Sequence, residues 1–260
     1  MSRPNVVVHA TADLLAAAAA ARLVTRLVDI QTASGSASVV LTGGRSGIAA
    51  LCQVAQTPAA GTVDWRRLDI YWSDERFLPT GHPDRNETQA RKALLDHVNV
   101  DPERVHPMGA SDGSWGDRDP DAAARAYEEL LLNRVRPEDH GPVPSFDICL
   151  LGVGDDGHVM SVFPGSPATY ETERAVVAVR GSPKPPSTRL TMTLPAIRSA
   201  AEVWLVVAGS EKAAAVAMAL RGAGEVQLPA AGATGRRRTL WMLDRAAAAK
   251  LPRDFMPPRL

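Results

Sequence analysis

Short runs of Val, Ile and Leu alternate along this chain with longer segments whose apolar residues recur every three or four positions. Runs of the first kind predict buried strands, and segments of the second kind predict amphipathic helices. The predicted strands cover residues 6–9, 38–41, 68–72, 147–151, 176–180, 189–193, 203–208 and 239–243. The predicted helices cover 11–31, 86–97, 211–221 and a short final segment at 246–250. Another predicted helix follows the loop at 42–47 and ends near residue 56, and one more begins at 119–120.

Strands and helices alternate in this prediction, which favours an α/β fold with a mostly parallel sheet covered by helices on both faces. Loops are expected at 73–79, 109–116 and 222–238, and Ser210 is expected to cap the helix that follows it. No long polar linker interrupts the pattern, so we expect a single domain over residues 1–260.

The overall composition excludes some classes of partner. Apolar residues make up 45% of the chain, and 29 basic residues balance 29 acidic ones, so the formal net charge is zero. Proteins that bind nucleic acids or membrane surfaces usually carry an excess of Lys and Arg, so neither partner is expected. The apolar run at 14–21 is too short to span a bilayer, and a cytoplasmic location is the default.

The two cysteines, Cys52 and Cys149, lie in apolar surroundings without metal-binding spacing. We interpret them as buried thiols in a reducing compartment, with a disulfide as the less favoured alternative.

Several polar loops directly follow predicted strands, and in an open parallel sheet such loops gather at one edge, where ligands bind. The first loop contains Thr42, Gly43, Gly44, Arg45 and Ser46. Its glycines precede a helix, so backbone N–H groups and the helix N-terminus would favour an anion such as phosphate. The alternative is a tight turn that needs glycine for its backbone conformation alone.

The second loop carries Asp74, Glu75 and Arg76 after an aromatic-ended strand. The planar guanidinium of Arg76 suits a phosphate group. A local ion pair among these neighbouring residues is the simpler alternative.

The third loop, L-L-G-V-G-D-D-G-H at 150–158, ends a buried strand in glycines and aspartates. Its glycines, Gly152, Gly154 and Gly157, would let the backbone approach a ligand, and Asp155 and Asp156 would orient His158 or cap the turn. A histidine that titrates near neutral pH suits general-base chemistry, although an isolated histidine is more often structural. The other histidines are scattered without paired spacing, so no metal is expected.

Three further basic residues lie close to later predicted strands. Lys184 and Arg189 belong to the stretch S-P-K-P-P-S-T-R-L, and Lys212 belongs to V-V-A-G-S-E-K-A. Each is a candidate contact for an anion, and each has the alternative of being an ordinary solvated side chain.

Taken in order, the motifs L-T-G-G, W-S-D-E-R-F-L-P, L-L-G-V-G-D-D-G-H-V-M-S-V-F-P-G, S-P-K-P-P-S-T-R-L-T-M-T-L-P and V-A-G-S-E-K-A resemble the 6-phosphogluconolactonase branch of the glucosamine-6-phosphate isomerase/6-phosphogluconolactonase family. The similarity runs from about residue 5 to 250. It implies a Rossmann-like three-layer αβα fold. It also implies hydrolysis of 6-phospho-D-glucono-1,5-lactone in the oxidative pentose phosphate pathway, without metal or organic cofactor.

The resemblance implies roles for particular residues. His158 would be the general base, while Arg76, Lys212 and the T-G-G loop would bind phosphate. Asp74 occupies the place of a proton-transfer acid in the deaminase branch, and its role in a lactonase stays open. This chain departs from the common pattern at 45–47 and at 85–86, so we place residues 85 and 86 outside the site.

Other functions stay open at this point. A phosphosugar deaminase or isomerase of the same superfamily is disfavoured, because the chain has D-E-R and S-V-F-P-G where deaminases carry D-E-Y and F-N-E-P. A non-catalytic phosphosugar sensor would use the same pocket. A serine esterase lacks support because no G-x-S-x-G is present. We expect a monomer or a weak homo-oligomer.

Overall fold

A sheet of seven parallel strands runs through the centre of the molecule in this computed structural model, which describes residues 5–113, 119–139, 141–252 and 255. The strand order is β1-β10-β9-β6-β2-β3-β5. The strands are β1 (Asn5–His9), β2 (Ala37–Leu41), β3 (Leu68–Trp72), β5 (Val105–His106), β6 (Ile148–Leu151), β9 (Glu202–Val207) and β10 (Arg238–Asp244).

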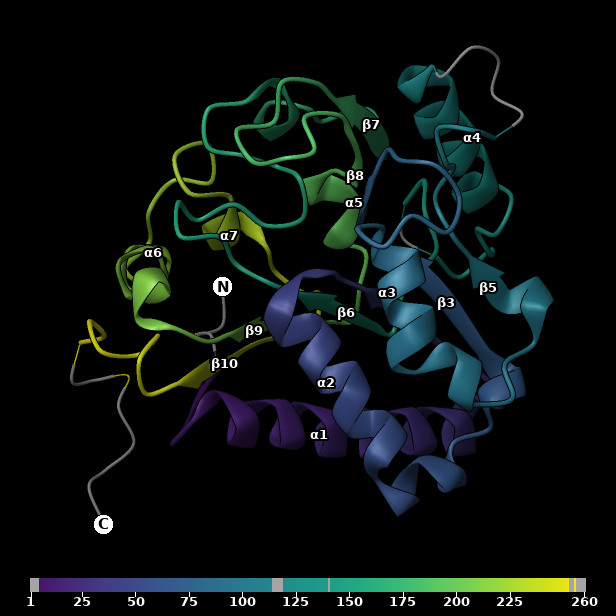
Figure 1. Ribbon diagram of the computed structural model, residues 1–260, viewed down its shortest axis with the longest axis horizontal. Helices are drawn as coiled ribbons and strands as arrows, with labels where there is room; N and C mark the ends of the chain where they lie inside the picture. Colours follow the sequence, from purple (N-terminus) through teal and green to yellow (C-terminus); the bar gives the residue numbers. More distant parts are fainter. Residues whose placement is uncertain (1–4, 114–118, 140, 253–254, 256–260) are drawn as a thin grey trace.

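The period-two pattern of the strands divides the core into two layers, one on each face of the sheet. Val39 and Leu41 of β2 join one hydrophobic cluster, whereas Val40 between them joins the other. One face is covered by α1 (Ala12–Ser34), α2 (Gly44–Gln56) and α3 (Asn86–Ala93), which lie below and in front of the sheet in Figure 1. The other face is covered by α4 (Pro120–Leu132), α5 (Leu194–Ile197), α6 (Ala213–Leu220) and α7 (Pro229–Gly232).

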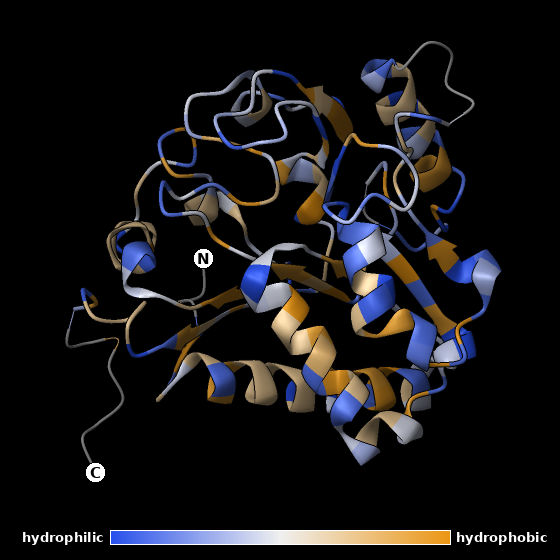
Figure 2. Cartoon of the chain, in the orientation of Figure 1, coloured by the Kyte–Doolittle hydropathy of each residue, from blue (hydrophilic) through white to orange (hydrophobic). Residues whose placement is uncertain are grey.

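The predicted α/β class and three-layer arrangement are therefore confirmed. Figure 2 shows the apolar residues concentrated on the strands and on the helix faces that meet them, with polar residues on the outer surfaces. Burial of both sheet faces is the reason that the strands consist of nearly continuous apolar runs.

A second, antiparallel sheet contains β4 (Asp74–Arg76), β8 (Arg189–Met192) and β7 (Val176–Val179), in the order β4-β8-β7. The prediction of a loop at 73–79 was therefore wrong at residues 74–76. A strand of three residues is too short to show an alternating pattern. Its extended conformation depends instead on pairing with β8, which lies far away in the sequence.

Other corrections concern short elements. β5, α5 and α7 were not predicted, and α7 falls in the expected loop 222–238. Residues 246–250 form turns instead of a helix, and Pro252 follows them. Ser210 does not cap a helix, because it is the first residue of a 3-10 turn whose cap is Gly209. The 3-10 helices are Pro58–Thr62, Trp65–Arg67, Leu95–His97, Pro102–Arg104, Pro167–Thr169 and Ser210–Lys212.

Two expectations from composition can be compared with the structure. Within the described ranges, no helix is both long and apolar enough to cross a membrane. Both cysteines are free thiols, and Cys149 is fully buried while Cys52 is partly exposed, so the disulfide alternative is excluded.

The loops that follow β2, β3, β6 and β9 leave the sheet at its carboxyl edge. Because β6 and β2 are central neighbours, the glycine-rich loops after them face each other across this edge. β4 and β8 approach the same edge from the second sheet. The sheet topology therefore brings together the loops that carry the candidate residues.

Candidate active site

A cavity of about 230 Å³ opens at the carboxyl edge of the sheet. Its walls come from the loops after β2, β6 and β9, from β4 and β8, and from the first residue of α3. Eleven of the residues singled out from the sequence line it: Thr42, Gly43, Gly44, Arg45, Ser46, Asp74, Arg76, His158, Lys184, Arg189 and Lys212. The fold thus gathers cations and one imidazole around a single space.

His158 and Asp156 form a hydrogen-bonded pair at one wall. The His158 Nδ1 lies 2.5 Å from Asp156 Oδ1, which also accepts the backbone N–H of His158 at 3.1 Å. Burial alone would raise the pKa of Asp156, but these hydrogen bonds and the charge of the imidazole outweigh it and lower the pKa to about 2. Since an ionised carboxylate only accepts, the proton resides on Nδ1 and the lone pair on Nε2.

Gly154 makes room for this pair. A Cβ atom at position 154 would lie 2.0 Å from His158 Nδ1 and 2.5 Å from Asp156 Oδ1. The imidazole also packs on the Phe163 ring, with 4.5 Å between ring centroids. The glycine-rich turn therefore exists at this point because any larger residue would displace the imidazole from its carboxylate.

The N-terminus of α2 opens into the cavity without a side-chain cap. Its N-cap is Gly43, which makes no capping hydrogen bond, and Gly44 has a φ of 78° that favours glycine. A Cβ at position 43 would lie 1.9 Å from Asn86 Oδ1. The first N–H groups of α2 and the positive end of its dipole are thus available to an anion.

Two arginines face each other on neighbouring strands of the second sheet. Arg76 of β4 is the register partner of Arg189 of β8. Like charges at directly opposite positions are unfavourable unless an anion or a carbonyl group compensates them. Arg189 donates to the carbonyls of Pro185, Pro186 and Lys184, and Arg76 donates to Asp84 O at 2.6 Å. The buried Nε of Arg76 has no hydrogen-bond partner among the described residues.

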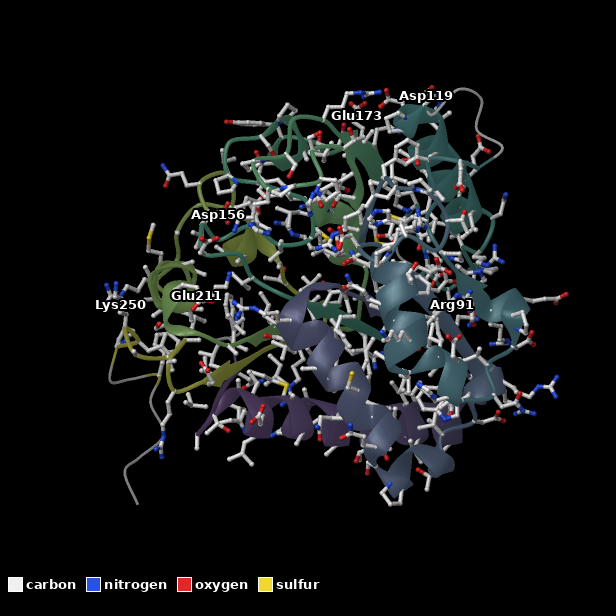
Figure 3. The ribbon with its side chains drawn as sticks, viewed as in Figure 1. Arg91, Asp119, Asp156, Glu173, Glu211 and Lys250 are labelled. Carbon is white, nitrogen blue, oxygen red and sulfur yellow. The ribbon has the colours of Figure 1, made fainter. Side chains whose placement is uncertain are left out.

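The other cations differ in how they are paired. Arg45 is 90% exposed at its side chain and bonds Glu211 at 3.0 Å, so its guanidinium points outward. Lys184 forms an ion pair with Asp155. Lys212 has no hydrogen bond from its ammonium group within the described part of the chain, and burial lowers its pKa. Figure 3 shows Glu211 and Asp156 on the same side of the molecule, near α6 and α7.

Asp74 is buried in the cavity wall, with 4% of its surface exposed. Its Oδ2 accepts a hydrogen bond from Ser161 Oγ at 2.8 Å, and the Asn86 amide donates to its Oδ1 and to its backbone carbonyl. Ser161 Oγ also accepts from Arg189 at 3.4 Å. Asp74 therefore holds the polar side chains of two other segments at the back of the cavity, and Ser161 links it to Arg189.

Three placements differ from the sequence-based expectations. Asn86 lines the cavity, although we placed it outside the site because the family pattern differs there. Gly157 does not line it, because its N–H bonds Gly154 O and a Cβ at this position would meet Leu228. Asp155 turns to Lys184, so of the two aspartates only Asp156 orients His158.

Gly152 and Gly154 line the cavity, as expected of the third loop. Sequence reasoning missed the other lining residues that offer only backbone or apolar atoms: Gly47, Val153, Met160, Val206, Val207 and Ala208. Those that end β6 and β9 were findable from the rule that strand ends line the site. Met160 has a positive φ of 56°, which no local pattern indicated.

No group of three or more His, Cys, Asp or Glu side chains is arranged to hold a metal ion in the ranges that the structure describes. The cations of the cavity suit an anionic ligand instead.

The model of the glucosamine-6-phosphate isomerases/6-phosphogluconolactonase family matches residues 10–241, nearly the whole chain. The chain belongs to this family. A 6-phosphogluconolactonase of Streptomyces coelicolor is 60% identical over 255 residues, covering 98% of this chain and 97% of that protein. A 6-phosphogluconolactonase of Mycobacterium tuberculosis is 52% identical over 240 residues, covering 92% of this chain and 95% of that protein.

Solved structures of the family share this fold. The 6-phosphogluconolactonase of Trypanosoma brucei superposes with a TM-score of 0.83 at 27% identity, covering 97% of this chain and 100% of that one. A monomeric glucosamine-6-phosphate deaminase superposes with a TM-score of 0.77 at 21% identity, covering 95% of this chain and 99% of that one. This chain therefore shares its fold with both of these solved structures.

Proposed function

We propose that this chain hydrolyses 6-phospho-D-glucono-1,5-lactone to 6-phospho-D-gluconate in the oxidative pentose phosphate pathway, with His158 as general base. The observation that carries the proposal is the His158–Asp156 pair, whose Nε2 is left free to accept a proton at the wall of a cavity lined by cations. The curated relatives at 60% and 52% identity, both 6-phosphogluconolactonases, support the same reaction.

The reaction begins with water at C1 of the lactone. Nε2 of His158 takes a proton from this water as its oxygen attacks the carbonyl carbon, and Asp156 stabilises the imidazolium that forms. The imidazolium then gives its proton to the ring oxygen as the C1–O bond breaks, which yields the free acid and regenerates the neutral base. A general base of this kind contributes roughly 10²–10⁴-fold.

The developing oxyanion needs N–H donors close to His158. Gly154 and Gly157 do not serve, because their N–H groups bond within the turn, to His158 O and Gly154 O. Gly152 and Val153 line the cavity, and their N–H groups have no partner in the described ranges. We assign the oxyanion to these two donors, the loss of one of which typically costs about 3 kcal/mol.

The phosphate of the substrate would occupy the opposite end of the cavity. The uncapped first turn of α2, the ammonium of Lys212 and the Arg76 guanidinium all line the cavity and would supply donors and positive charge to it. Binding at this remote end fixes the lactone ring relative to His158, so that affinity for phosphate contributes to the rate.

A coupled assay on freshly generated 6-phosphogluconolactone tests the proposal. Wild type should exceed the spontaneous rate, and His158→Ala should lose most of kcat while still binding 6-phosphogluconate. Turnover of the variant at the wild-type rate would remove His158 from the mechanism.

The same preparation separates the alternative functions. Ammonia release from glucosamine 6-phosphate would identify a deaminase, and binding of 6-phosphogluconate without hydrolysis would identify a sensor.

We further expect a cytoplasmic enzyme without a nucleic-acid partner or cofactor, acting as a monomer or weak homo-oligomer. Sedimentation analysis measures the oligomeric state.

A further inference from the structure

Glu75 lies directly behind the cavity wall. It is the middle residue of β4, whose flanking residues Asp74 and Arg76 line the cavity. Successive side chains of a strand point to opposite sides, so the Glu75 carboxylate points away from the cavity. It is completely buried, with 0% of its surface exposed. A carboxylate in such a place requires several compensating partners.

The partners of Glu75 are backbone N–H groups of two segments that form the site. Its Oε1 accepts from Arg76 N at 2.7 Å and from Asn86 N at 2.6 Å, and its Oε2 accepts from Glu87 N at 2.9 Å. Asn86 and Glu87 are the first two residues of α3, whose N-cap Arg85 makes no side-chain capping bond. One carboxylate therefore caps α3 and joins it to β4.

Arg85 completes this buried arrangement. Its guanidinium is 2% exposed and lies 3.6 Å from Glu75 Oε2. It also donates to the carbonyls of Leu78, Met108 and Gly109, at 3.2, 2.8 and 3.3 Å. Burial raises the pKa of Glu75 to about 7, although Arg85 and the three backbone N–H groups oppose this rise. The Arg85 guanidinium also ties the loop between β4 and α3 to the chain near residue 108.

On the cavity side of this junction, the same two segments meet again. Asn86 Nδ2 donates to Asp74 O at 2.9 Å, and Arg76 Nη1 donates to Asp84 O. The Oδ1 of Asn86 and the Nε of Arg76 are buried without a partner among the described residues, and both residues line the cavity. Their positions follow from the backbone that Glu75 holds.

We propose that Glu75 is a positioning residue that sets substrate affinity by holding Arg76 and Asn86 in the cavity wall. It acts through its two acceptor oxygens, because all three donors are backbone groups that packing alone would leave unsatisfied. The inference rests on the proposed function, which assigns Arg76 and the first turn of α2 to the phosphate end of the lactone site; Asn86 lies beside Gly43, the N-cap of that helix.

The direct test is Glu75→Gln, which preserves size but removes the charge and replaces one acceptor oxygen by a donor. We expect KM for the lactone and Kd for 6-phosphogluconate to rise about tenfold, with kcat changed less than about threefold. Glu87→Gln is the matched control, because Glu87 also approaches Arg85, at 3.8 Å, but its side chain bonds no cavity residue. Its KM should stay at the wild-type value.

A purely structural role would give a different pattern. If Glu75 acts through Arg76, Glu75→Gln in an Arg76→Ala background should raise KM by less than about threefold while still lowering the melting temperature. An unchanged KM in the single variant, or an equal tenfold rise in the Arg76→Ala background, would overturn the inference. If Glu75→Gln does not fold, Glu75→Asp replaces it as the test variant, because it keeps the carboxyl group. We expect a smaller rise of KM for Glu75→Asp, and an unchanged KM in this variant would also overturn the inference.

Calorimetric binding of 6-phosphogluconate separates this inference from the proposed function, because it requires no turnover. Wild type that binds the product but hydrolyses no lactone would refute the lactonase assignment. Weaker binding by Glu75→Gln in the same experiment would still support the positioning role.

Discussion

Replacement of Asp156 by asparagine tests the centre of the proposed chemistry. The pKa of Asp156 is about 2, against an ordinary value of 3.8. This difference corresponds to about 2 kcal/mol of interaction between the ionised carboxylate and its partners. Because 35% of the Asp156 side chain is exposed, solvent screening reduces this interaction to about 1 kcal/mol, which corresponds to a factor of roughly five in rate.

Asparagine has a second effect on the imidazole. Its amide can present an N–H group to Nδ1, which would move the ring proton to Nε2 and abolish the base. Together with the lost charge, we expect kcat to fall about 10²-fold, within the range of general-base effects. KM should stay nearly constant, since Asp156 does not line the cavity.

Steady-state kinetics in the coupled lactone assay measures this effect, with Asp155→Asn as the control. Asp155 is the adjacent carboxylate, but it pairs with Lys184, whereas His158 bonds Asp156. We expect its kcat to be close to that of wild type. A kcat of Asp156→Asn within threefold of wild type would show that the carboxylate neither orients nor stabilises the base.

Further outcomes are expected from the same geometry. Gly154→Ala should fold but lose about 10²-fold in kcat, because the new Cβ would meet His158 Nδ1 at 2.0 Å; circular dichroism and the lactone assay check both parts. Lys212→Ala should raise KM about tenfold with a smaller change of kcat, and an unchanged KM would place the phosphate elsewhere. Because the folded pKa of Asp156 is depressed, its stabilisation is complete above pH 3.8 and is lost as pH falls toward 2. Urea unfolding at pH 4.5 and 2.5 measures how much the free energy of unfolding falls between these two pH values. We expect this fall to be about 1 kcal/mol smaller for Asp156→Asn than for wild type, and an equal fall would contradict the ion pair.

The layered fold was predictable because burial on both faces of the sheet leaves continuous apolar runs, which local sequence displays directly. The position of His158 after β6 and of Gly43 after β2 followed from the same pattern together with the rule that strand ends meet at one edge. These inferences need only the order of the elements along the chain.

Other features of the site depended on contacts between distant residues. Nothing local distinguishes Asp155 from Asp156, yet one pairs with Lys184 and the other with His158. Arg45 follows the paired glycines as a phosphate contact would, but Glu211 draws its guanidinium outward. Asn86 enters the cavity only because Glu75 and Asp74 hold the start of α3 against β4.

The sequence by itself determined the layers, the order of the elements and the edge at which chemistry is expected, since periodic burial and glycine-rich turns are local properties. The tertiary structure alone decided which carboxylate meets which cation and which side chains turn into the cavity. Such choices depend on the distance and desolvation of groups that are far apart in the chain, and no local pattern encodes them.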